Sequence, residues 1–240
     1  MNSNKNNKLA FSTNDAIQGY LPLMHELATR IQLVADACEG RLNLPNVYAR
    51  EFSYLQFRYM CELIALGCLQ FSGNLPQAQK QSTKKEWNAA KIMKILHKDH
   101  ADAFPQQAER VQINNVFDIK CNTRPNALKL NEFKDLYFEC GEVLHRGNIL
   151  TNKPSCLFTE YDYQRILNWQ SKIVDLMNEH FYPRENGLGY YLVSLRTTSG
   201  YPECTLINRN QTGVLGISQF TMSIKEKNSK NMKSKLPILY

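Results

Sequence analysis

The chain lacks the features that most readily identify a function. Its 240 residues contain no apolar run of the roughly 18 residues that a membrane-spanning helix needs. The polar start, Met1 to Lys8, is followed by no short apolar core, so we expect no secretory signal. There is no phosphate-binding Gly-x-x-x-x-Gly-Lys-[Ser/Thr] loop, no Gly-x-Ser-x-Gly elbow and no His-Glu-x-x-His pair. We therefore predict a cytoplasmic protein without these catalytic signatures.

Cysteine is present, but its spacing does not favour disulfides or metal binding. The seven cysteines are an odd number, and no two have Cys-x-x-Cys spacing. Cys61 and Cys68 lie in an apolar stretch, as is typical of thiols that pack as small apolar side chains. His97 and His100 flank Asp99 at helical spacing, yet a metal needs further ligands. We predict reduced thiols, no metal and no cofactor; a zinc site or a lone catalytic thiol is the alternative.

Positive charge is in excess and lies largely at the two ends. The net charge is +7, of which the segment 225–235 carries +4, and Lys5 and Lys8 add two more, which leaves +1 for the body between them. A body so close to neutral argues against a dedicated duplex-DNA binder, although electrostatic attraction to RNA or DNA stays open. We predict a disordered N-terminus over residues 1–12 and a basic tail over residues 225–240.

Apolar periodicity predicts a helical bundle over residues 13–182. Capping residues, glycines and prolines bound a set of helices at about 13–38, 47–71, 84–98, 132–146 and 159–181. Residues 99–130 hold two prolines and are expected to form a long connection with at most one short element. The prediction is a bundle of four to six helices.

The pattern changes to β-forming residues after the last helix. Residues 190–197, 204–207 and 214–224 are separated by turn sequences and predict a three-stranded antiparallel meander within residues 186–224. Three strands alone are marginally stable, so the meander is expected to pack on the helices or on a protein partner. The predicted fold class is mainly α, an α+β arrangement of a bundle with a small C-terminal sheet.

The most apolar predicted helix carries a pair of opposite charges. From Phe57 to Leu69 only Arg58, Glu62 and Gly67 are not apolar. A helix that is apolar nearly all round is normally buried, and charges inside it need partners. Because Arg58 and Glu62 are four residues apart, they lie on one helix face and are able to form an ion pair.

A second polar group lies at the end of the helix predicted over 132–146. Glu142 precedes His145 by three residues and Arg146 by four, so the three side chains lie on neighbouring faces of the last turn. One interpretation is structural, because the helix dipole favours cations at a C-terminus and Gly147 is a suitable cap.

The other interpretation is functional, and it joins the two polar groups in one cluster. A titratable base, carboxylates and two fixed cations would suit a phosphate or a nucleotide. In this interpretation the catalytic residues are His145, Arg146 and Glu142, and the binding residues are Arg58, Glu62 and Asn148. A structural network of ion pairs would use the same side chains.

These motifs together resemble those of the HEPN superfamily. Arg58-x-x-x-Glu62 in the second helix and Glu-Val-Leu-His-Arg-Gly at residues 142–147 carry the resemblance, which covers about residues 12–181. Members are small helical bundles, many of them RNases or nucleotide-binding modules of bacterial toxin–antitoxin and phage-defence systems. The resemblance implies a bundle, a homodimer and an RNA or nucleotide ligand. The superfamily's nuclease signature, an arginine followed after four to six residues by a histidine, occurs at none of the five histidines.

We therefore predict a non-catalytic interaction or regulatory module. One alternative is an RNA-directed nuclease or nucleotide-binding enzyme in which His145 is the general base and Arg58 and Arg146 hold phosphate. A second is a structural assembly protein that docks through residues 186–224. Trp87 lies among lysines that would suit nucleic acid, but we expect its indole to face the core.

Overall fold

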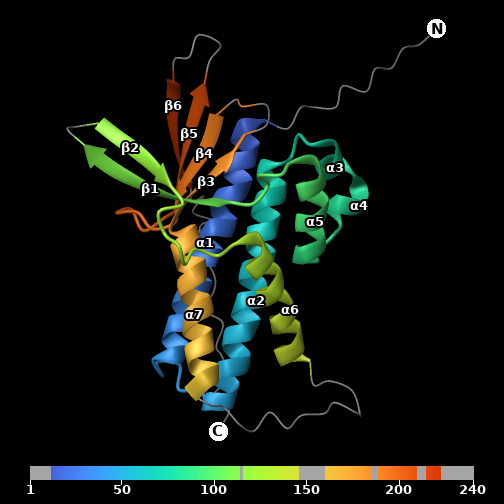
Figure 1. Ribbon diagram of the computed structural model, residues 1–240, viewed down its shortest axis with the longest axis vertical. Helices are drawn as coiled ribbons and strands as arrows, with labels where there is room; N and C mark the ends of the chain where they lie inside the picture. The colour runs from blue at the N-terminus through green and yellow to red at the C-terminus, as the bar shows by residue number, and fades with distance from the viewer. Residues whose placement is uncertain are drawn as a thin grey trace, which may run out of the picture.

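The fold is a bundle of long helices capped at one end by a sheet (Figure 1). The computed structural model describes residues 12–113, 116–145, 160–184, 187, 189–209 and 215–222. In chain order the elements are α1 (Thr13–Cys38), α2 (Asn46–Phe71), α3 (Pro76–Gln79), α4 (Gln81–Lys84), α5 (Ala89–Asp99), β1 (Gln106–Ile113), β2 (Val116–Cys121), α6 (Leu130–Leu144), α7 (Glu160–Met177), β3 (Glu179–Pro183), β4 (Gly189–Ser194), β5 (Glu203–Arg209) and β6 (Leu215–Thr221).

The four long helices α1, α2, α6 and α7 lie side by side, and α2 contacts each of the others (Figure 1). The short helices α3 and α4 and the longer α5 gather beside the upper half of α2, away from α7 (Figure 1). Within the part of the chain that the structure describes, no helix combines the length and the apolarity needed to cross a bilayer.

Local signals set the ends of the first two long helices. The Ser12 hydroxyl accepts a hydrogen bond from the Asp15 amide at 3.0 Å and caps α1, while Gly40 follows the helix with a φ of 73°. Pro45 precedes α2. The predicted ends of both helices, at residues 38 and 71, are confirmed, and the predicted start of the second lies one residue from Asn46.

The helices predicted over 84–98 and 159–181 have different bounds in the structure. The stretch predicted over 84–98 is broken, because the Glu86 carboxylate accepts hydrogen bonds from the Trp87 and Asn88 amides at 3.1 and 3.0 Å. Asn88 then caps a new helix, α5, through the Lys91 amide. The helix predicted to reach residue 181 ends at Met177, and the chain continues as strand β3.

The sheet is larger than predicted. Its six strands are all antiparallel in the order β2-β1-β3-β4-β5-β6. The predicted meander is confirmed as β4, β5 and β6, which form one half of the sheet. The prediction of a long connection over residues 99–130 is wrong, because half of this segment is the β1–β2 hairpin, in which Val111 pairs with Asp118.

Bundle and sheet share one continuous apolar core. The Tyr20 ring of α1 stacks on Phe71 of α2 at a centroid distance of 3.9 Å, and Phe71 stacks on Tyr191 of β4 at 4.1 Å. Val193 and Cys204 of the same sheet are fully buried among these groups. The sheet is therefore packed on the helices. This was expected, because a three-stranded meander by itself would be only marginally stable.

Candidate functional site

The predicted pair on α2 is formed. Arg58 Nε lies 3.3 Å from Glu62 Oε1, and the two side chains are 23% and 24% exposed. Both charges thus reach solvent beside an otherwise buried helix. An ion pair of this exposure contributes at most about 1 kcal/mol to stability, so its presence alone does not indicate a structural role.

Arg58 also connects α2 to α6. Its guanidinium lies over the Tyr137 ring, 5.2 Å from the centroid, which is within cation–π range. The Tyr137 hydroxyl is buried and has no hydrogen-bond partner of good geometry among the described residues. Burial raises the pKa of Tyr137, and the Arg58 charge opposes that rise.

The second predicted group lies farther along α6. Glu142 and His145 are exposed, and His145 is the C-terminal capping residue of α6. Arg146 and Asn148 lie outside the described residues. The described contacts join neither Glu142 nor His145 to Glu62, and the roles predicted for these side chains stay predictions.

The direction of α6 explains why His145 and Glu62 lie apart. The helix runs antiparallel to α2, so its C-terminal end approaches the start of α2 (Figure 1). The hydrogen bond from the Tyr54 hydroxyl to Glu139 shows that these two residues lie at the same level of the bundle. His145 is six residues beyond Glu139, and Glu62 is two turns from Tyr54 in the other direction. A separation on the order of 15–20 Å follows along the bundle axis.

A carboxylate that the sequence did not single out ties three helices together. Glu139 of α6 accepts hydrogen bonds from the Tyr54 hydroxyl, from both Arg165 Nε and Nη2, and from Trp169 Nε1 at 3.1 Å. Burial acts to raise the pKa of Glu139, but Arg165 and the other donors hold it below its ordinary value. All the acceptor sites face protein donors, so this network is structural.

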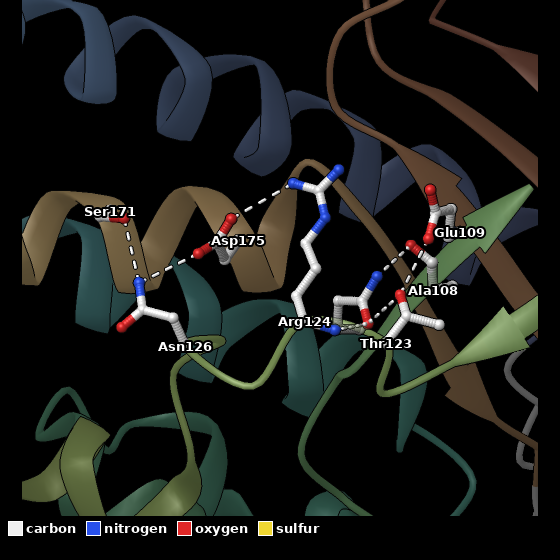
Figure 2. A network of polar contacts seen from close by, with 8 residues as sticks. Ala108, Glu109, Thr123, Arg124, Asn126, Ser171 and Asp175 are labelled. Carbon is white, nitrogen blue, oxygen red and sulfur yellow. Dashed lines mark hydrogen bonds and ion pairs between the residues drawn. The ribbon is translucent and has the colours of Figure 1, made fainter.

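A second polar network anchors the segment between β2 and α6 (Figure 2). Arg124 Nη1 and Asn126 Nδ2 donate to the two carboxylate oxygens of Asp175 at 3.3 and 3.0 Å. The buried Gln107 accepts from the Thr123 hydroxyl and from the Arg124 amide. These bonds fasten the β1–β2 hairpin to α7 and leave the side chains paired with one another.

His180 is buried where the bundle meets the sheet. Its Nδ1 lies 3.0 Å from the Met177 carbonyl and its Nε2 lies 2.6 Å from the Tyr20 hydroxyl. Because a carbonyl only accepts, Nδ1 carries the proton and Nε2 accepts from Tyr20. Burial lowers the pKa of His180 to about 4, so the imidazole is neutral near pH 7. With no exposed surface, it has a structural role.

Four thiols match the prediction of small apolar side chains, whereas Cys121 is exposed, Cys38 is half-buried and Cys156 lies outside the described residues. Cys61, Cys68, Cys140 and Cys204 are buried, and burial raises the pKa of each. Such thiols stay protonated and are poor nucleophiles. In the described ranges, no three or more His, Cys, Asp or Glu side chains gather as a metal site would require.

The expectation that Trp87 faces the core is wrong. Its side chain is 66% exposed, because the bonds of Glu86 to the backbone interrupt the helix at this point. The hydrogen bond from the Asn88 amide, the nearby Lys91 charge and the hydrogen bond from the Trp87 amide lower the pKa of Glu86.

Lysines are frequent in the sequence on both sides of this tryptophan. Residues 80–98 contain six lysines and one glutamate, a net charge of +5, and all six lysines are exposed. Three of them recur along one face of α5, at Lys91, Lys94 and Lys98. We call Trp87 and the six lysines the lysine surface; the lysines are Lys80, Lys84, Lys85, Lys91, Lys94 and Lys98. The signal in the sequence was the lysine spacing, but it did not reveal the exposure of the indole.

Protein-family models, curated proteins and solved structures give no match for this chain. The HEPN-like resemblance therefore stays a prediction.

Proposed function

We propose that the chain is a non-catalytic interaction module of the cytoplasm whose ligand is single-stranded RNA, bound on the lysine surface. The HEPN-like motifs support a bacterial regulatory setting such as a toxin–antitoxin or phage-defence system. The buried, protonated thiols agree with a reducing compartment. The homodimer implied by the resemblance and a protein partner for residues 186–224 are further predictions, which the mass of the protein in solution tests.

The observation that carries the proposal is that Trp87 is exposed in a lysine-rich segment. An indole that is 66% exposed leaves a large apolar face in water, and that face contributes little to folding. Lysine ammonium groups attract phosphates, and an exposed aromatic ring stacks on an unpaired base. Stacking requires a base that is free of a duplex, and this favours a single strand.

The charge distribution adds to this support. The body outside the termini carries only +1, yet residues 80–98 carry +5, so positive charge is concentrated on one side of α2. Among the described residues, none of the six lysines lies within ion-pair distance of a carboxylate. Their charge is therefore directed to solvent and to any polyanion there.

Fluorescence anisotropy with a labelled 12-nucleotide single-stranded RNA tests the proposal. Trp87→Ala is expected to weaken binding by about 5- to 100-fold, the range for losing one stacked base. Tyr48→Ala is a matched control, because Tyr48 is an exposed aromatic residue (57%) at the start of α2. Equal affinity of the Trp87→Ala variant and the wild type, with both variants folded by circular dichroism, would contradict the proposal.

A second candidate is the RNA-directed enzyme. It is favoured by the exposure of His145 and Glu142 on the last turn of α6, where a base and a carboxylate are accessible to a ligand. Under this candidate, purified protein cleaves a labelled RNA, and His145→Ala lowers the rate at least 100-fold. His97→Ala on α5 is the control, because His97 is also exposed. Cleavage that survives His145→Ala would remove this residue as the general base.

A further inference from the structure

A groove adjoins the lysine surface. It has a volume of about 570 Å³ and lies between α1, α2 and the α3–α4 segment. Its apolar walls come from Leu23 of α1 and from Leu66 and Leu69 of α2, and its rim includes Lys84. A volume of this size is within the range of pockets that take small organic groups.

Leu66 is the unusual wall residue. It lies in the most apolar stretch of α2, whose neighbours Ala65, Gly67 and Cys68 are buried, yet its side chain is 37% exposed. The partly buried Leu23 and Leu69 line the same groove. The groove thus offers an apolar surface to a flat group that enters from solvent.

Two amide side chains give the groove polar edges. Gln79 donates to the Gly73 carbonyl and accepts from Lys84 Nζ at 3.0 Å, so it fixes the rim lysine in place. The Gln70 side chain packs against Gly19 of α1. A Cβ atom at position 19 would lie only 1.8 Å from Gln70 Nε2. Glycine at position 19 therefore makes room for this amide beside the apolar walls.

We propose that the groove receives one unstacked base of the single-stranded RNA whose phosphates lie on the lysine surface. The inference rests on the proposed function and extends it with a second base contact. A nucleobase has apolar faces that match the leucine walls, and the two glutamines keep a polar edge beside these walls although each amide already makes a hydrogen bond within the protein. Continuity is provided by Lys84, which belongs to both the groove and the lysine surface.

Chain geometry permits one strand to reach both base sites. Lys84 and Trp87 are three residues apart, so their Cα atoms are at most about 11 Å from each other. A strand that contacts the Lys84 ammonium with a phosphate is therefore close to the indole as well.

The test compares two 12-nucleotide oligomers of equal charge, one with bases and one with abasic sugars, by fluorescence anisotropy. The Trp87→Ala variant removes the stacking contact, so any remaining preference for the base-bearing oligomer comes from elsewhere. We expect that preference to be about five-fold or more. The added substitution Leu66→Asn should lower it to about one. Tyr59→Asn, at a residue of similar exposure (39%) on the same helix, should leave it unchanged.

The outcomes separate the two proposals. If neither oligomer binds the wild-type protein, the proposed function fails, and this inference fails with it. If both bind but Trp87→Ala alone abolishes the preference for bases, the groove takes no base and only this inference is overturned. A preference that survives Leu66→Asn in the Trp87→Ala background overturns it as well, and leaves the groove for another partner such as a peptide.

Discussion

The buried imidazole of His180 couples the stability of the fold to pH. Its pKa in the folded protein is about 4, below the ordinary value of about 6.5, because burial disfavours the charged ring. The unfolded chain therefore binds this proton first as the pH falls. The stabilising contribution is fully present above pH 6.5 and is lost progressively toward pH 4, up to about 3 kcal/mol.

Urea unfolding of the wild type and of His180→Gln between pH 7 and pH 5 measures this effect. The wild type is expected to lose about 2 kcal/mol over that range, and the variant much less, because a glutamine amide has no proton to gain there. Most carboxylates still hold their charge above pH 5, so the difference between the two proteins isolates the imidazole. Parallel pH dependences would contradict the assignment.

Sequence reasoning at the level of single residues succeeded where spacing alone fixed the contact. Arg58 and Glu62 are neighbours on any helix, so their ion pair was predictable. Glu139 was not, because its donors Arg165 and Trp169 come from a distant helix whose packing the sequence does not state. Trp87 was misplaced because local backbone bonds to Glu86 outweighed the apolar periodicity.

At the scale of elements, the contact between α1 and α2 depends on a glycine. A Cβ at Gly67 would lie 2.6 Å from the Tyr20 ring, which is held by its stack on Phe71 and its bond to His180. Gly67→Ala is expected to destabilise the protein by about 2 kcal/mol, although alanine favours helices.

Gly141 provides the control on another long helix. Nothing lies within 4 Å of a Cβ built at this position on α6. Gly141→Ala should therefore stabilise the protein by about 0.5–1 kcal/mol, the ordinary gain of helix propensity. Thermal unfolding of the two variants checks both signs; a stabilising Gly67→Ala would mean that the two helices are able to move apart.

The elements differ in how far the sequence reveals them. The helices α1 and α2 have strong periodicity and local caps, and their bounds were predicted closely. The hairpin β1–β2 was missed because Gln106–Ile113 mixes polar, charged and apolar side chains without regular alternation. The alternation in Val116–Cys121 covers only six residues. Strand β3 was absorbed into α7, since Phe181 and Tyr182 continue the apolar pattern of that helix.

At the scale of the whole molecule, the proposed RNA binding depends on where positive charge lies. Of the net +7, the termini hold a large share that any polyanion would attract without specificity. The lysine surface differs because its charges lie on and beside the helices α4 and α5, in the same segment as an exposed indole. If it binds RNA, removing lysines there must matter more than removing lysines elsewhere.

The salt dependence of RNA binding tests this claim most directly. The measurement is the slope of log affinity against log salt for a single-stranded 12-nucleotide RNA, in the full-length protein. The wild type is expected to give a clearly negative slope, to which each lysine in contact with phosphate contributes about −0.7. The double variant Lys91→Gln and Lys94→Gln should make the slope shallower by about 1 to 1.5, whereas Lys120→Gln and Lys129→Gln, two exposed lysines outside the lysine surface, should leave it unchanged. Equal slopes in all three proteins, or the same loss in both double variants, would contradict the account.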